Sequence, residues 1–128
     1  MPSKHLFIIR VGLIAGVFSF AGVALYQRMQ GASPAGLADQ LPLGTLRYVL
    51  WILVALSALA SLFLRTRVGA ATPTQRGLFT ILGWTFGEGV ALFGVVIHFA
   101  GGPVTSLALG LLAFVFALLM LPVPRGQP

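Results

Sequence analysis

Cysteine is absent from this 128-residue chain, and acidic side chains are almost absent, since Asp39 and Glu88 are the only two. Without cysteine, the chain has no disulfide, no thiolate metal site and no cysteine nucleophile. Its two histidines and two acids supply no Ser-His-Asp set, and neither an H-E-x-x-H motif nor a phosphate-binding glycine loop occurs. We therefore expect no enzyme activity, no catalytic residue and no metal site.

Charge is scarce as well, because charged residues make up 8% of the chain and hydrophobic residues 58%. A soluble domain carries about a quarter charged residues. The net charge of +6 comes from eight basic residues that stand mostly at the ends of apolar runs. Nucleic-acid-binding proteins gather Lys and Arg on one face, so we expect no nucleic-acid partner. Basic residues beside apolar runs are typical of membrane anchors, and the predicted surroundings are a lipid bilayer.

Four apolar runs fill most of the sequence, at residues 6–26, 46–64, 77–99 and 104–121. Each is close to the length of about 20 residues that a helix needs to cross a hydrocarbon core about 30 Å thick. Backbone groups in lipid must satisfy their own hydrogen bonds, which favours helices. The sequence predicts an all-α membrane protein, a single domain over residues 1–128 with four transmembrane helices in two antiparallel hairpins. The first run is longer than a signal-peptide core, so we expect it to be retained, with cleavage at Gly31-Ala32-Ser33 as the alternative.

Glycine and proline mark the connections between these runs. The longest connection, residues 30–45, is expected to rest on the outer surface with at most one short helical turn. Residues 69–75 separate the second and third runs, and Thr72 or Thr74 is placed to cap the third. Gly101-Gly102-Pro103 predicts a tight turn before the fourth.

The basic residues are unevenly divided between the two sides of the predicted bundle. The side that holds both termini carries Lys4, Arg65, Arg67, Arg76 and Arg125, whereas the other side carries Arg28 and Arg47. Cytoplasmic loops are enriched in Lys and Arg. This count predicts cytoplasmic termini in an inner (plasma) membrane, with Tyr26, Tyr48 and Trp51 near the outer interface.

Small residues recur at the spacing that lets transmembrane helices approach closely. The first run contains one G-x-x-x-G pair and the third contains another, which two further small residues extend; these positions are Gly12, Gly16, Gly83, Gly87, Ala91 and Gly94. Packing inside the bundle and contact with another subunit or copy are both compatible with this pattern. The fourth run shows little small-residue patterning and is expected to face lipid.

Glu88 lies near the middle of the third run, where an ionisable side chain is costly and therefore a functional candidate. Its possible roles are packing, contact with a partner subunit or cofactor, and proton transfer. Arg10 and His98 are its possible partners, Arg10 from the first run and His98 from ten residues further along the third. His98 itself is expected at the membrane interface, with axial ligation of a haem or chlorophyll-type pigment as the alternative. No cofactor is required by the sequence.

Residues 87–96 resemble the carboxylate helix of the ring-forming c subunit of rotary ATP synthases. That family carries a membrane-embedded acid followed by an aliphatic-aromatic-Gly-x-Val pattern, matched here by Glu88, Leu92, Phe93, Gly94 and Val96. The resemblance covers the second and third runs and implies that Glu88 carries a proton. The chain as a whole resembles the small four-helix proteins of bacterial inner membranes.

Two functional hypotheses follow from these features. The first is a non-catalytic accessory or structural subunit that packs beside a larger respiratory, photosynthetic or transport complex, or that self-associates. The second is a proton or ion carrier centred on Glu88. A dimeric transporter is a weaker third hypothesis, because few polar residues are available to line a path.

Overall fold

The computed structural model describes residues 3–31 and 42–123. These residues form four helices and no strand: α1 (Ser3–Met29), α3 (Leu43–Ala70), α4 (Pro73–Phe99) and α5 (Val104–Met120). The four predicted helical runs are thus confirmed. Most of the predicted surface connection at residues 30–45 lies outside the described residues.

Three of the helices are long and apolar enough to cross a membrane. Their candidate spans are Lys4–Met29, Gly44–Ala70 and Pro73–Phe99, of 26, 27 and 27 residues. The fourth helix, α5, is apolar but has 17 residues, which corresponds to about 25 Å at 1.5 Å per residue. It is therefore slightly shorter than a hydrocarbon core of about 30 Å.

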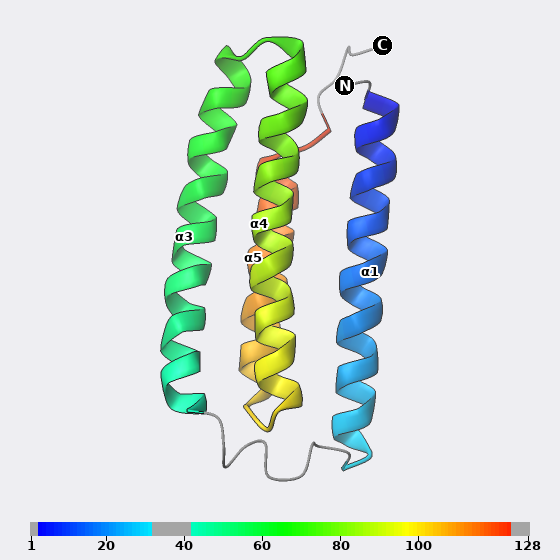
Figure 1. Cartoon of the computed structure of the whole chain (residues 1–128), viewed down its shortest axis with the longest axis vertical. Coiled ribbons are helices and arrows are strands. Elements are labelled where there is room, and N and C mark those ends of the chain that lie inside the picture. Colours follow the sequence, from blue (N-terminus) through cyan, green and yellow to red (C-terminus); the bar gives the residue numbers. More distant parts are fainter. Residues whose placement is uncertain (1–2, 32–41, 124–128) are drawn as a thin grey trace.

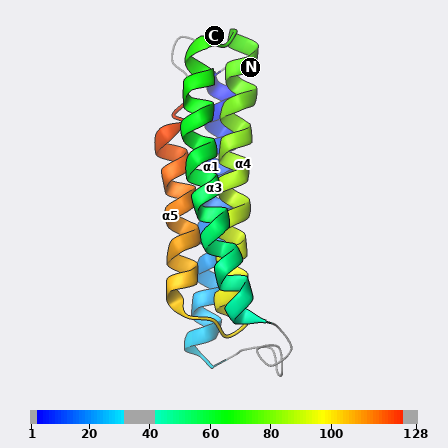
Figure 2. The ribbon, with the colours of Figure 1, turned by 90° about the vertical axis from the view of Figure 1, so that its left-hand side faces the viewer.

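Helix α4 occupies the centre of the molecule. Figure 1 shows α3 and α1 on its two sides, and the turned view in Figure 2 shows α5 running beside the α3–α4 pair. The colour order shows that α1 and α4 run in one direction and α3 and α5 in the other. Helix α1 packs mainly on α4. The first two helices are therefore antiparallel in direction, but α4 lies between them.

The connection between α3 and α4 is shorter than the sequence predicts. The predicted break covers residues 69–75, but α3 continues to Ala70 and α4 begins at Pro73. Thr72 caps α4, since its Oγ1 accepts a hydrogen bond from the backbone N–H of Gln75 at 3.4 Å. Proline suits the first position of a helix because its missing N–H has no partner there. Arg65 and Arg67 consequently lie on a helix rather than in a loop.

The connection between α4 and α5 is the predicted tight turn. Gly101 has a φ of +117°, a backbone conformation that glycine adopts without a steric penalty. The N–H of Gly102 donates to the carbonyl oxygen of Ile97 at 2.9 Å. Carbonyl groups at the end of α4 are thereby satisfied within the turn.

Helix α5 is not mainly lipid-facing, which corrects the expectation from the sequence. Its small residues face α4 and are buried, at Ser106, Gly110, Ala113 and Ala117. A Cβ built on Gly110 would lie 3.0 Å from both the Cα and the carbonyl oxygen of Ala91. The two backbones are therefore in close contact. The small residues that permit this contact stand three or four positions apart, among the leucines of the fourth run.

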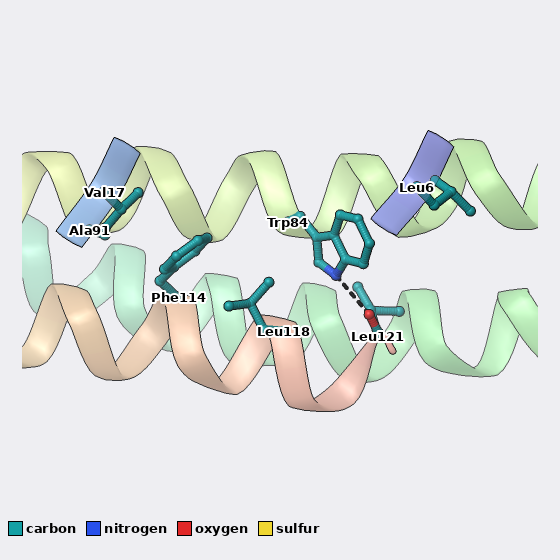
Figure 3. Close-up of a cluster of buried hydrophobic side chains, with 7 residues drawn as sticks. All are labelled: Leu6, Val17, Trp84, Ala91, Phe114, Leu118 and Leu121. Carbon is teal, nitrogen blue, oxygen red and sulfur yellow. Dashed lines mark hydrogen bonds between the residues drawn. The ribbon is translucent and has the colours of Figure 1, made fainter. Parts of the chain in front are cut away.

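One part of the core joins α1, α4 and α5, and another joins α3, α4 and α5. The first part contains the largest buried side chain. Trp84 is fully buried there with Leu6 of α1, Phe114 of α5 and Leu121 beyond the end of α5. The indole Nε1–H of Trp84 donates to the carbonyl oxygen of Leu121 at 2.7 Å, as drawn in Figure 3. This bond satisfies a donor that would be costly to bury unpaired, and it fixes the segment that follows α5.

Candidate functional site around Glu88

Glu88 lies on the face of α4 that contacts α1. It follows Trp84 by four residues and precedes Val95 by seven, spacings that place all three on one side of a helix. Trp84 packs with Leu6 of α1, and Val95 packs with Ala21 of α1. Glu88 therefore lies between these two contacts and is half-buried.

The part of α1 opposite Glu88 is apolar. Residues 11–20, between the Trp84 and Val95 contacts, contain no ionisable side chain, and their only polar one, Ser19, is exposed. Leu13 and Ile14 pack against the same cluster as Trp84. Across residues 3–31 and 42–123, Glu88 has neither a hydrogen bond nor an ion pair. Glu88 thus faces an apolar stretch of α1, and its carboxyl group has no polar partner among the described residues.

Arg10 is near Glu88 but is directed to a different group. Its guanidinium carbon lies 5.6 Å from the centre of the Trp84 ring, within the range of about 6 Å for a cation–π contact. Trp84 is one helical turn, about 6 Å, before Glu88 along α4. The structure therefore brings Arg10 and Glu88 to the same interface, with Arg10 on the indole ring.

His98 is buried within the bundle near the end of α4, and its place at the membrane interface stays a prediction. Its Nδ1 lies 3.2 Å from the carbonyl oxygen of Gly102, and its Nε2 is buried without a hydrogen-bond partner. It follows Glu88 by ten residues, about 15 Å along the helix, so the two do not form one site. The described residues contain no group of three or more potential metal ligands.

The glycine pairs of α1 and α4, which look alike in sequence, lie in different surroundings. A Cβ built on Gly87 would lie 2.9 Å from Cβ of Ala117 in α5, and one on Gly94 would collide with the carbonyl oxygen of Ser106. Gly83 and Ala91 are buried on the same helix. By contrast, a Cβ on Gly12 or Gly16 would meet nothing within 4 Å. The α4 set packs the bundle internally, and the α1 pair faces outward.

Two buried hydroxyls were not singled out from the sequence. Ser57 and Ser61 of α3 are each 1% exposed, and neither Oγ has a hydrogen-bond partner. They are four residues apart and therefore on one face of the helix. The available signal was the small-residue cluster of the second run, which identified a packing face but not two unpaired hydroxyls.

The sequence matches no protein-family model, no curated protein and no solved structure. The resemblance of residues 87–96 to the rotary ATP synthase c subunit accordingly stays a prediction, and function is argued below from the geometry.

Proposed function

We propose that this chain is a multi-pass protein of the inner (plasma) membrane, with both termini in the cytoplasm, that acts as a non-catalytic subunit and packs laterally against another membrane protein through α1. The orientation is supported by the basic residues: Arg65, Arg67 and Arg76 lie near the α3–α4 connection, at the end of the bundle where α1 begins. Exposed Tyr26, Tyr48 and Trp51 lie toward the opposite end.

The observation that carries the proposal is the outward-facing glycine pair of α1. The most apolar part of α1 is 17% buried, the same share as in α3 and well below the 50% of α4, and of these three helices only α1 has an exposed pair of glycines four residues apart. Gly12, Gly16 and Ser19 lie on one side of α1, all exposed. In lipid, helix association depends on close packing rather than on the hydrophobic effect, and small residues permit that approach. The exposed face of α1 and the face of α4 that contacts α5 both carry glycines four residues apart, but no helix of the described residues covers the face of α1.

The test replaces Gly12 and Gly16 with Leu in the full chain. Both positions are open, so the fold should persist while a partner helix can no longer approach. We expect the protein to migrate in a larger complex on blue-native electrophoresis in mild detergent, and the Gly12→Leu, Gly16→Leu variant to migrate alone. Gly89→Leu is the matched control, because Gly89 is also exposed with open space around it but is not part of the pair. Unchanged migration of the α1 variant would contradict the proposal.

A second experiment, the recovery of tagged copies from membranes, separates self-association from binding to another protein. Two differently tagged copies expressed together should be recovered in one complex if the partner is a second copy. If the partner is another subunit, one tagged copy should instead recover that subunit from native membranes, and the copy with the other tag should be absent from the complex. A wild-type protein that migrates as a single chain on the gel and recovers neither a second copy nor another subunit would contradict the proposal.

A second function, proton carriage by Glu88, is favoured by the absence of a partner for its carboxyl among the described residues. An intramembrane acid without a structural partner is a functional candidate. The test is proton flux into liposomes that contain the full chain. We expect Glu88→Gln to lose the flux if Glu88 carries protons, and Glu88→Asp to retain part of it. Equal flux for wild type and Glu88→Gln would exclude this role without affecting the lateral-packing proposal.

A further inference from the structure

A groove runs along the side of the bundle between α3 and α5. One part of it is an open cavity of about 400 Å³ lined by apolar side chains, among them Val54 and Ala58 of α3 and Leu112, Phe116 and Leu119 of α5. A second cavity, of about 440 Å³, adjoins it, since Leu119 lines both. The two cavities thus follow one another along α3 and α5 on either side of Leu119, and together they are called the groove.

The second cavity exists because α5 ends early. Helix α3 has 28 residues and α5 has 17, a difference of about 16 Å in length. The α3–α4 pair continues past the end of α5, as Figure 1 shows. The space left there is lined by Arg65 and Val68 of α3, Thr80 of α4 and the segment that follows α5.

The groove has one polar end and one apolar end. Val54, Ala58, Arg65 and Gly69 line it from α3, and their spacings of four, seven and four residues place them on one side of the helix. From Arg65 to Val54 is about 16 Å along the helix, close to half of a hydrocarbon core about 30 Å thick. The apolar part thus has the depth of one leaflet below a guanidinium group.

Arg65 has no anionic partner within the described residues. Its Nη1 lies 3.4 Å from Sδ of Met120, and a thioether is a weak acceptor. The one acid in the described residues, Glu88, lies on the α1 side of α4. The two arginines nearest to it are held elsewhere: Arg67 lies 4.9 Å from the centre of the Phe63 ring, and Nε of Arg76 donates to the carbonyl oxygen of Ala71 at 3.1 Å.

We propose that this groove binds one anionic phospholipid, with an acyl chain along Val54, Ala58 and Leu112 and the phosphate at Arg65. A guanidinium recognises phosphate through several parallel N–H donors, and the apolar lining offers no polar group that an acyl chain would have to leave unpaired. The inference requires the chain to lie in a bilayer, but it is independent of the partner proposed for α1.

The test measures lipid binding to the purified full chain by native mass spectrometry in mild detergent. Phosphatidylglycerol and phosphatidylethanolamine with identical acyl chains are compared. We expect one phosphatidylglycerol to bind about fivefold more tightly than phosphatidylethanolamine. Both lipids offer a phosphate to Arg65, but phosphatidylethanolamine also brings an ammonium group, whose repulsion of the guanidinium costs about 1 kcal/mol. Equal affinity for the two lipids would overturn the proposal, because the groove would then select no headgroup.

Two matched pairs of variants locate the site. Arg65→Gln should lose the preference for phosphatidylglycerol, whereas Arg67→Gln, with the same charge change two residues away, should keep it. Ala58→Trp fills the apolar part and should weaken both lipids, whereas Leu59→Trp, at a neighbouring position that is 64% exposed, should weaken neither. Equal losses within either pair would overturn the proposal, and circular dichroism melting shows that each variant is folded.

A final arm distinguishes a lipid from a soluble anion at Arg65. Inorganic phosphate in large excess should not displace phosphatidylglycerol from the wild type, because phosphate lacks the acyl chain that occupies the groove. Displacement by phosphate alone would mean that the site takes a soluble anion, and the lipid assignment would be wrong.

Discussion

The indole of Trp84 and the carbonyl oxygen of Leu121 are joined by a buried hydrogen bond of 2.7 Å. The ring of the same side chain also contacts Arg10 of α1, whose guanidinium carbon lies 5.6 Å from the centre of the ring. Trp84 of α4 therefore contacts α1 through its ring and binds the segment that follows α5 through its Nε1–H. Three parts of the chain that are far apart in sequence meet at this position.

We expect Trp84→Phe to destabilise the bundle by about 1–3 kcal/mol, because the carbonyl oxygen of Leu121 is left unpaired in a buried position. The measurement is the equilibrium unfolding of the full chain in mixed detergent micelles. Trp51→Phe is the control, because Trp51 is 56% exposed and its replacement should change stability little. Equal effects of the two substitutions would show that the Leu121 hydrogen bond contributes nothing specific.

The contact between α4 and α5 predicts a strong dependence on glycine at two facing positions. Gly110→Ala and Gly94→Ala each place a methyl group against backbone atoms of the other helix, and backbone cannot move aside as a flexible side chain can. We expect each substitution to cost about 1–3 kcal/mol, the usual effect of overpacking, in the same unfolding assay. Gly89→Ala, in open space, should be neutral or slightly stabilising, since alanine favours helix. A stable Gly94→Ala variant would mean that the two helices are further apart than described.

The capping contact at the start of α4 gives a smaller and more local prediction. Thr72→Ala removes the oxygen that accepts the N–H of Gln75. Loss of such a cap costs about 0.5–2 kcal/mol. Hydrogen exchange should therefore speed up in the first turn of α4 while the middle of the helix is unaffected. Thr72→Ser retains the acceptor and should behave as wild type, and equal exchange in all three proteins would argue against the cap.

The positions of the helices in the sequence were predictable, but which helices pack against one another was not. Hydropathy located all four runs because each is apolar over a length that no loop would have, and glycine and proline located the α4–α5 turn. The α3–α4 connection is shorter than the predicted break at residues 69–75, because α3 continues past the apolar run, through Arg65 and Arg67, to Ala70. Arginine is a good helix former, so the end of the apolar run does not mark the end of the helix. Which helices touch depends on the whole bundle, and α4 lies between α1 and α3 for reasons that no single run contains.

The candidate site shows the same division. Glu88 was identified from its position in an apolar run, because an acid there is rare whatever surrounds it. Its surroundings were not predictable: Arg10 reaches the interface but contacts Trp84, and His98 turns inward to Gly102. Gly12 and Gly83 begin identical motifs, yet one faces outward and the other is buried. A spacing rule identifies a smooth helix face but does not say which helix covers it.

The position of Arg10 leads to a prediction that separates two electrostatic arrangements. If its guanidinium rests on the Trp84 ring, the stability effects of Arg10→Gln and Trp84→Leu should be non-additive by about 0.5–2 kcal/mol, the range for cation–π contacts. Arg10→Gln and Glu88→Gln should instead be additive within about 0.5 kcal/mol, as for residues that share no contact. Both cycles use equilibrium unfolding of the full chain in the same micelles. A larger coupling of Arg10 to Glu88 than to Trp84 would show that the guanidinium pairs with the carboxylate in the membrane, so that Glu88 has an internal partner and loses the feature that makes it a candidate proton carrier.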